Sequence, residues 1–319
     1  MYYIIVNPAS RSGRGARIWS EQVEPALQEK QVSYQAYFSG KSGEVRQLAS
    51  QITKEHADET DLKLIILGGD GTVNEAIQEI GDLSKVILGY IPTGSSNDLA
   101  RDLGISKDPK AALELILENT APRAMDLGRL TYLDEDLPEE SRLFAVSCGI
   151  GFDAAVCAEA MSSRIKDTMN RIGLGKLTYL GIALKQLITA RKVSCSLTLE
   201  NTKDGTQKSV SLSRFLFVTC MSHRYEGGGF MFCPPAIDHD GMLDLCVVGN
   251  ISKALVLVAL PTAFFGKHYF VKGIDAYTAT KMSVTASAPL WVHTDGEVTR
   301  KSHGFRVECL PGAVRMITP

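Results

Sequence analysis

The chain has 319 residues, of which 45% are hydrophobic and 22% are charged, and its formal net charge at pH 7 is −2. This composition excludes a disordered or fibrous protein, and the length favours two domains with separate cores. A charge so close to zero also excludes a general attraction to nucleic acid or anionic lipid, so any such contact must come from a local patch.

Strands and helices alternate through residues 1–127. The predicted strands are Tyr2–Val6, Val32–Phe38, Leu64–Leu67 and Val86–Ile91, and the predicted helices are Ile18–Glu29, Glu44–His56, Val73–Ile80, Asn97–Leu103 and Lys110–Glu118. Helices of this length between strands imply a parallel, doubly wound α/β sheet. In such sheets, ligands bind beyond the carboxyl ends of the strands.

Residues 128–319 are rich in β-strand patterns and favour an antiparallel β-sandwich, with the last residues of the chain allowed to return to the first domain. The predicted strands are Leu143–Cys148, Val193–Glu200, Val210–Thr219, Leu243–Val248, Met282–Ala286, Leu290–His293 and Phe305–Leu310. Two helices, Gly173–Arg191 and Ser252–Phe265, interrupt them. The acidic segment Thr131–Arg142 is predicted to be an exposed loop.

The segment Leu64–Glu75, LIILGGDGTVNE, is the most informative part of the chain. Its three glycines can take positive φ and let backbone amides approach a ligand, and the helix that follows begins with an N-terminus suited to phosphate. Asp70 would repel phosphate unless a divalent cation lay between them. The segment therefore predicts nucleotide with Mg²⁺. A tight turn in which Asp70 caps a helix explains the same spacing equally well.

Four polar loops follow the four predicted strands of the first domain. They are Asn7–Gly13, Ser39–Gly43, Gly68–Thr72 and Pro92–Asp98, and all are rich in Gly, Ser, Thr, Asn or Asp. Because the carboxyl ends of parallel strands share one edge of the sheet, we expect the four loops to line one site.

Together these motifs resemble the diacylglycerol kinase catalytic-domain family of lipid kinases, which shares its nucleotide fold with NAD kinases and sphingosine kinases. The matching motifs occur in family order and cover essentially the whole chain. They are Asn7-Pro8, Gly68-Gly69-Asp70-Gly71-Thr72 with Asn74-Glu75, Gly94-Ser95-Ser96-Asn97-Asp98, Gly149-Ile150-Gly151-Phe152-Asp153, Asp240-Gly241-Met242-Leu243-Asp244 and Asp295-Gly296-Glu297.

The resemblance implies which residues bind ATP and Mg²⁺. Asp70 and Asp98 would organise the catalytic magnesium through water. Ser39 and Ser95 stand where the family usually has Thr, and both keep a hydroxyl group. The implied nucleotide-binding residues are Asn7, Pro8, Ser10, Ser12, Gly13, Ser39, Gly68, Gly69, Asp70, Gly71, Thr72, Asn74, Glu75, Gly94, Ser95 and Asn97.

The resemblance also implies a catalytic base and a second metal site. Glu297, or less favourably Asp295, would accept the proton of the lipid hydroxyl, which places the expected active site in the interdomain cleft. A structural magnesium would be held by the Asp240 carboxylate and the backbone carbonyls of Ile237 and Met242.

Simpler explanations exist for the same three acidic motifs. Asp98 can cap a helix, Asp240 can be a turn residue, and Asp295-Gly296 can form a type I′ hairpin turn. The roles of Arg11, Arg14 and Arg17, either in phosphate binding or in solvation of the first helix, stay undecided.

We expect no signal peptide, because the first apolar run is too short and follows no positive region, and the longest apolar stretch, Ala254–Phe265, is too short to span a bilayer. We expect a cytoplasmic protein that makes peripheral contact with the inner face of the membrane, where its lipid substrate resides. We interpret Ala254–Phe265 as a helix buried against a sheet, with membrane contact as the alternative. The better candidates for contact with anionic headgroups are the basic residues Arg164, Lys166, Arg171, Lys176, Lys185, Arg191 and Lys192.

The predicted activity is an ATP- and Mg²⁺-dependent lipid kinase acting on diacylglycerol or a similar long-chain lipid alcohol. The alternatives are an NAD kinase-like enzyme with a soluble substrate, and a regulator that binds nucleotide and lipid without catalysis. A homodimer is compatible with the sequence. The seven cysteines lack zinc or disulfide spacing and are expected in the core.

Overall fold

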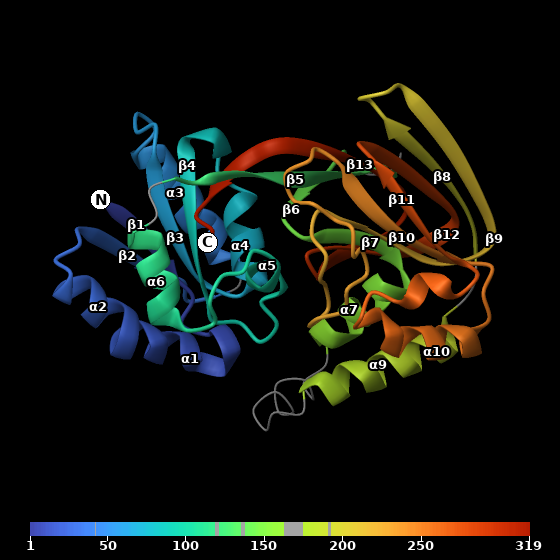
Figure 1. Cartoon of the computed structure of the whole chain (residues 1–319), viewed down its shortest axis with the longest axis horizontal. Coiled ribbons are helices and arrows are strands. Elements are labelled where there is room, and N and C mark those ends of the chain that lie inside the picture. The colour runs from blue at the N-terminus through green and yellow to red at the C-terminus, as the bar shows by residue number, and fades with distance from the viewer. Residues whose placement is uncertain (42, 119–120, 135–137, 163–174, 191–192) are drawn as a thin grey trace. The chain divides into compact units, whose positions relative to one another are not determined.

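The computed structural model describes residues 1–41, 43–118, 121–134, 138–162, 175–190 and 193–319, with the backbone alone at 162 and 175–180. The chain divides into two compact units (Figure 1). Unit 1 comprises Met1–Asp126 and Gly312–Pro319, and unit 2 comprises Leu127–Pro311. The predicted loop Ser39–Gly43, the acidic segment and the helix Gly173–Arg191 each fall partly outside the described residues.

The sheet of unit 1 is parallel, as predicted. Its strands are β1 (Tyr2–Val6), β2 (Tyr34–Phe38), β3 (Leu62–Gly68) and β4 (Val86–Pro92), in the order β2-β1-β3-β4. The end of β13 (Glu297–Met316) adds a further parallel strand beside β4. The strands β1, β3 and β4 are almost continuously buried, which is typical of a sheet covered by helices on both faces.

The helices of unit 1 form two groups. In the first, α3 (Glu44–Glu55) packs beside α4 (Asp70–Ile77). In the second, α6 (Pro109–Glu118) packs against β4 and against the stretch formed by α1 (Ser10–Ile18), the π-helix η1 (Trp19–Val23) and α2 (Glu24–Glu29). The shorter η2 (Leu83–Lys85) and α5 (Asp98–Asp102) complete the unit.

Unit 2 is an antiparallel sandwich, which confirms the predicted fold class. Two long strands, β9 (Thr206–Met221) and β12 (Lys281–Thr294), each pair with both β7 (Ser147–Gly151) and β8 (Val193–Asn201) and so close a circuit of four strands. The register of β12 shifts between Thr285 and Leu290, where the strand passes from one partner to the next. The remaining strands are β5 (Arg123–Tyr132), β6 (Ser141–Phe144), β10 (Leu243–Gly249), β11 (Ile274–Ala279) and β13.

The core of unit 2 is filled from both layers of strands. Phe144, Phe215, Val284 and Phe305 are among its fully buried side chains. All seven cysteines are free and five of them are buried, as expected for small core residues.

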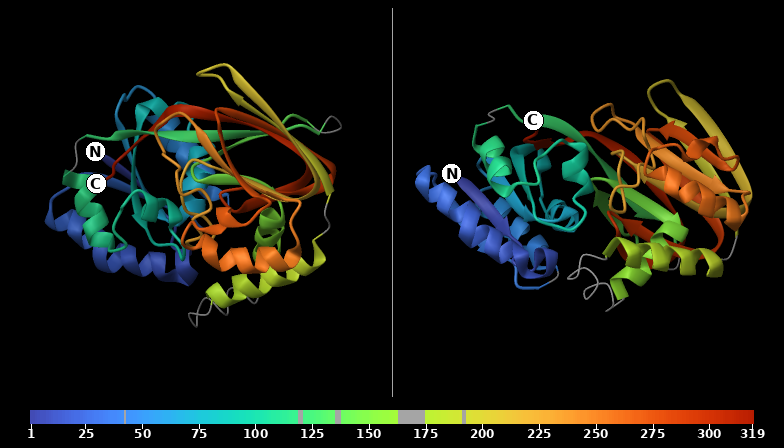
Figure 2. Two further views of the ribbon diagram at one scale, coloured as in Figure 1. Left: turned by 45° about the vertical axis from the view of Figure 1, so that its right-hand side comes forward. Right: turned by 60° about the horizontal axis from the view of Figure 1, so that its bottom comes forward.

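Three helices lie together on unit 2: α7 (Phe152–Ser162), α9 (Gly175–Thr189) and α10 (Lys253–Ala263), followed by the 3-10 turn η3 (His268–Phe270) (Figure 2). Among the described residues, no helix is both long enough and apolar enough to cross a membrane.

Several elements differ from the predictions. Leu143–Cys148 contains two strands, β6 and β7, whereas Met282–Ala286 and Leu290–His293 belong to the single strand β12. The acidic loop is shorter than predicted, because β5 extends to Tyr132 and Arg142 is buried within β6. The strands β5 and β11 and the helix α7 were not predicted.

Candidate active site

The predicted loops of unit 1 meet at one edge of its sheet. The register places Val6 opposite both Phe38 and Leu67, so β1, β2 and β3 end at the same level. Side chains then join the loops. Asn7 Nδ2 donates to Thr72 Oγ1 at 3.1 Å. The hydroxyl groups of Ser10 and Thr93 lie 2.7 Å apart, which joins the first loop to the fourth.

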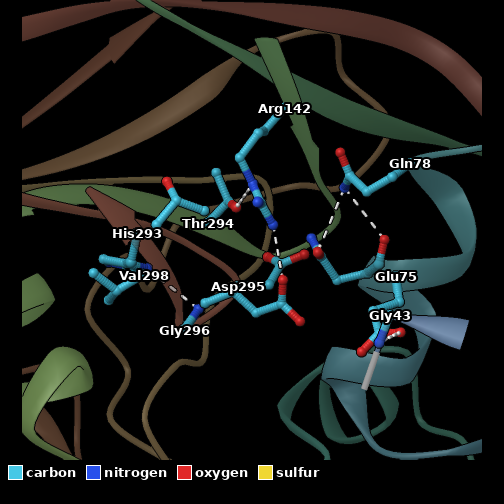
Figure 3. Close-up of polar contacts among 12 residues, drawn as sticks. Gly43, Glu75, Gln78, Arg142, His293, Thr294, Asp295, Gly296 and Val298 are labelled. Atoms are coloured by element: carbon cyan, nitrogen blue, oxygen red, sulfur yellow. Dashed lines mark hydrogen bonds and ion pairs between the residues drawn. The ribbon is translucent and has the colours of Figure 1, made fainter. Parts of the chain in front are cut away.

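The loop after β2 reaches the same edge. Ser39 is buried, and its N–H donates to the carbonyl of Val6 at 3.0 Å. The N–H of Gly43 donates to Glu75 Oε2 at 3.2 Å, which connects this loop to α4 (Figure 3). All four loops therefore belong to one polar edge, as the sequence predicted.

The glycines of the GGDGT loop are needed for close packing. The predicted positive φ is wrong for them, since none of Gly68, Gly69 and Gly71 is among the glycines with positive φ. A Cβ on Gly68 would lie 2.4 Å from Thr72 Oγ1, and a Cβ on Gly94 would lie 2.7 Å from the Cα of Gly69. An added Cβ on Gly71 would meet nothing within 4 Å, so this glycine borders open space.

The first turn of α1, the helix that follows β1, is interrupted by three consecutive residues in left-handed conformation. They are Arg11 (φ 49°), Ser12 (φ 60°) and Gly13 (φ 90°). Two non-glycine residues in this region are unusual and cost energy, and such conformations are concentrated at functional sites. Successive N–H groups in turns of this kind form concave anion-binding surfaces.

Asp70 joins the third loop to the fourth. Its Oδ2 accepts the N–H of Asp98 at 2.7 Å, and its Oδ1 accepts the hydroxyl of Tyr90 at 3.1 Å. Asp70 therefore caps α5. The Asp98 carboxylate is buried and pairs with Arg101 Nη1 at 3.2 Å.

These residues fit Mg²⁺ and phosphate. A carboxylate has about four lone-pair sites, so a carboxylate that accepts hydrogen bonds can also bind a cation or its water. Oxygen donors of this kind are the ligands that Mg²⁺ prefers. Burial, together with the charges of Asp70 and Asp98, raises the pKa of Tyr90 well above 10, so its hydroxyl stays a donor.

In unit 2, Asp295 and Gly296 of the Asp-Gly-Glu motif form a two-residue hairpin turn between β12 and β13. Asp295 (φ 49°) and Gly296 (φ 80°) both have positive φ, as a type I′ turn requires. The Asp295 carboxylate accepts three backbone N–H groups, from Ala145 and Val146 at 2.8 Å and from Ser147 at 2.9 Å. These bonds anchor the turn to the beginning of β7.

Glu297 is held by a buried arginine that the sequence did not single out. Arg142 Nη2 donates to Glu297 Oε2 at 2.8 Å. The Nε of Arg142 donates to Thr294 Oγ1 at 3.0 Å, which fixes the guanidinium plane (Figure 3). The Glu297 side chain keeps 27% exposure, so the carboxylate is oriented and still accessible.

A buried charge cluster supports the same turn. His293 is fully buried, with Nε2 at 3.2 Å from Asp153 Oδ2 and 3.4 Å from Glu226 Oε1. Burial opposes its ionisation, but Glu226 and Asp153 raise the pKa of His293 to about 9. A Cβ on Gly149 would lie 2.2 Å from Asp153 Oδ2, which explains the glycine in the Gly149–Asp153 motif.

The predicted structural metal ligands lie in a turn before β10. Asp240 Oδ1 accepts the N–H of Met242 at 2.9 Å, the Asp240 carbonyl contacts Lys203 Nζ, and Ile237 is exposed. Burial and then the Asp240 charge raise the pKa of Asp244 to about 6. The described part of the chain contains no group of three or more His, Cys, Asp or Glu placed to hold a metal. This site stays a prediction.

The two units correspond to the two halves of a known class of kinase. Residues 1–130 match the family model of the diacylglycerol kinase catalytic domain, and residues 146–318 match the YegS C-terminal NAD kinase beta sandwich-like domain. The chain therefore belongs to the diacylglycerol kinase family of lipid kinases. The catalytic domain of this family implies a kinase that uses ATP.

Individual relatives agree over nearly the whole length. A diacylglycerol kinase of Mycobacterium tuberculosis is 27% identical over 319 residues, covering 99% of this chain and 94% of that protein. The crystal structure of a diacylglycerol kinase from Bacillus anthracis has the same fold, with a TM-score of 0.65 at 20% identity, covering 100% of this chain and 96% of that one. Family membership favours a lipid kinase over the two alternative functions.

Proposed function

We propose that this lipid kinase transfers the γ-phosphoryl group of ATP to the hydroxyl group of diacylglycerol or a similar long-chain lipid alcohol, and that it requires Mg²⁺. The observation that carries the proposal is the bonding of Asp70 to Asp98 and Tyr90, which brings two carboxylates to the glycine-rich edge of unit 1. Relatives of this chain named diacylglycerol kinase support the choice of lipid.

Unit 1 binds the nucleotide in this proposal. The left-handed turn at Ser12-Gly13, the Gly68–Thr72 loop and the Gly94–Asn97 loop offer N–H and hydroxyl groups to the phosphates. Mg²⁺, when bound, neutralises charge on the phosphate oxygens. Asp70 and Asp98 supply the carboxylates that hold the ion through water.

Unit 2 supplies the base. Glu297 accepts the proton of the lipid hydroxyl, and a positioned carboxylate of this kind contributes roughly 10²–10⁴-fold to the rate. Arg142 orients Glu297. The carboxylate of Asp295 is used by three backbone N–H groups, which makes it an anchor for the turn and a poorer base than Glu297.

Two further roles belong to the proposal. The Asp240 carboxylate and the carbonyls of Ile237 and Met242 bind a second, structural magnesium ion. The enzyme also makes peripheral contact with the inner face of the membrane, because its ATP is cytoplasmic and its lipid substrate lies in the bilayer.

The test is transfer of radiolabelled phosphate from ATP to a panel of lipid alcohols in mixed micelles, with and without Mg²⁺. We expect diacylglycerol to be labelled only with Mg²⁺. Glu297→Gln should lower kcat by at least about 10²-fold while nucleotide binding is preserved. Glu308→Gln, on the same strand β13, is the matched control and should keep full turnover. Absence of transfer to every lipid would refute the substrate, and full turnover by Glu297→Gln would remove Glu297 from the mechanism.

A further inference from the structure

The helix α10 is apolar on the side that faces solvent. Its buried stripe consists of Val256, Ala259 and Ala263. Outside this stripe, Leu255 is 47% exposed and Val258 is 61% exposed. A helix on the surface of a globular protein normally carries polar residues there. The prediction that this segment is a helix buried against a sheet is therefore right for one stripe only.

The exposed apolar surface continues beyond the end of α10. Phe264 is 42% exposed, Phe265 is 73% exposed and Phe270, in η3, is 71% exposed. The Phe264 ring stacks on Phe230 with centroids 4.0 Å apart, and Phe230 in turn stacks on Phe232 at 5.5 Å. This stack holds the exposed end of the helix in a defined position.

The end of α9 adds to the same surface. Lys253 Nζ, at the start of α10, donates to the carbonyl of Ile188, so the two helix ends lie side by side (Figure 2). Ile188 is 73% exposed. We call Ile188, Leu255, Val258, Phe264, Phe265 and Phe270 the α10 face. Exposed apolar side chains gathered on neighbouring elements in this way favour a site of interaction with a protein or a membrane.

The segment that carries most of the α10 face has charges of one sign. Residues 251–273 contain three lysines, Lys253, Lys267 and Lys272, and no acidic residue. Lys267 and Lys272 are exposed and form no ion pair with any described residue. Of the basic residues favoured for headgroup contact in the sequence, Arg164, Lys166, Arg171, Arg191 and Lys192 and the side chain of Lys176 lie outside the described part, and Lys185 pairs with Glu159.

We propose that the α10 face docks the enzyme on the surface of an anionic lipid bilayer. The apolar side chains enter the boundary between headgroups and acyl chains, and the lysines contact the anionic headgroups. The inference rests on the proposed function, since a long-chain lipid alcohol must be taken from a membrane. A second copy of the chain fits the face less well, because a two-fold contact would bring lysines against lysines with no acid in the segment.

Binding to vesicles tests the inference directly. The full chain is sedimented with vesicles of pure phosphatidylcholine and with vesicles of an equimolar mixture of phosphatidylcholine and phosphatidylglycerol. Wild type should bind the anionic vesicles more tightly. The Val258→Ser, Phe265→Ser double variant should lower the partition constant at least about tenfold. The Lys267→Gln, Lys272→Gln double variant should lower the partition constant about tenfold for anionic vesicles and leave it unchanged for pure phosphatidylcholine.

Two controls separate docking from folding and from catalysis. Leu133→Ser removes another apolar side chain of unit 2, 42% exposed, and should bind vesicles like wild type. Both double variants should phosphorylate a water-soluble short-chain diacylglycerol at the wild-type rate. If no diacylglycerol of any chain length is phosphorylated, the proposed substrate fails, and vesicle binding still decides the docking.

Vesicle binding that is unchanged in the serine variant would overturn the inference. So would a wild-type dimer that binds no vesicles and that the serine variant dissociates in sedimentation velocity, because the α10 face would then be an interface between copies.

Discussion

The buried cluster around His293 makes the stability of unit 2 depend on pH. His293 faces Asp153 and Glu226, which raise its pKa to about 9 although burial opposes this. Below pH 6.5 the ring is protonated in both the folded and the unfolded chain. Between 6.5 and about 9 only the folded chain holds the proton, so stability falls as pH rises through this window, and above it the stabilisation is lost.

The magnitude follows from the two pKa values. A shift from 6.5 to about 9, at about 1.4 kcal/mol per unit, corresponds to about 3 kcal/mol of unfolding free energy. The perturbation is the double variant His293→Gln, Glu226→Gln. It leaves Asp153 with a neutral amide donor and removes both the imidazole and the carboxyl group of Glu226, whose pKa burial raises. Between pH 6.5 and pH 9, the free energy of unfolding should fall by about 3 kcal/mol more in wild type than in this variant.

Urea unfolding at the two pH values measures this difference. The chain has two tryptophans, and Trp291 lies on β12 two residues before His293. In a Trp19→Phe background, the fluorescence of Trp291 reports on unit 2 alone. The extrapolated unfolding free energies of wild type and double variant, both in this background, are then compared at each pH.

An equal loss in both proteins would refute the reasoning. The ring would then be neutral in the folded chain, with Nδ1 accepting the N–H of Gly296 at 3.3 Å (Figure 3). We expect the His293 ring to be protonated instead. The two carboxylates near Nε2 favour the charged ring more than the hydrogen bond to Nδ1 favours the neutral one, because that bond is longer than the usual 2.7–3.2 Å range.

Three further substitutions test the site. Arg142→Gln removes the donor to Glu297. Steady-state kinetics should show kcat lowered by about tenfold to 10²-fold with the KM for ATP unchanged. A raised KM with an unchanged kcat would contradict the role of Arg142 in orienting the base. Tyr90→Phe removes the hydroxyl donor to Asp70 and should lower the free energy of unfolding by about 1–2 kcal/mol. It should also raise the Mg²⁺ concentration needed for half-maximal activity. An unchanged Mg²⁺ requirement would show that Tyr90 does not affect metal binding. Gly94→Ala places a Cβ 2.7 Å from the Cα of Gly69 in the facing loop. It should raise the KM for ATP at least about tenfold while the circular dichroism spectrum stays unchanged. A wild-type KM would show that the close packing of the two loops is not needed for nucleotide binding.

The sequence predicted the elements of unit 1 well, because each strand of a parallel sheet is a local signal. Leu64–Leu67 is apolar without interruption and is followed at once by glycines, and the structure extends the strand by only a few residues. The strands of unit 2 were harder to predict from the sequence, because they are long and bend. The two segments around Leu290 appeared separate because the register shift in β12 interrupts the alternation of side chains.

The supporting residues of the site could not be predicted from local sequence. Arg142 and Glu297 are 155 positions apart, and their contact depends on β6 lying near the hairpin turn. His293, Asp153 and Glu226 come from three different segments. Each alone looks like an ordinary polar residue, and only the fold brings them together.

The glycines illustrate a similar limit. The approach of the backbone amides of the GGDGT loop to a ligand stays a prediction, whereas the positive φ predicted for its glycines is wrong. The contact between Gly69 and Gly94 depends on a second loop, so no local pattern reveals it.

Gly312–Pro319 belong to unit 1 although they are synthesised last, and this order affects how the chain folds during translation. The strand beside β4 is translated only after every residue of unit 2, so a nascent chain carries an unfinished sheet in unit 1 with β4 unpaired on that side. The sheet of unit 1 is therefore completed only when the end of β13 has been synthesised.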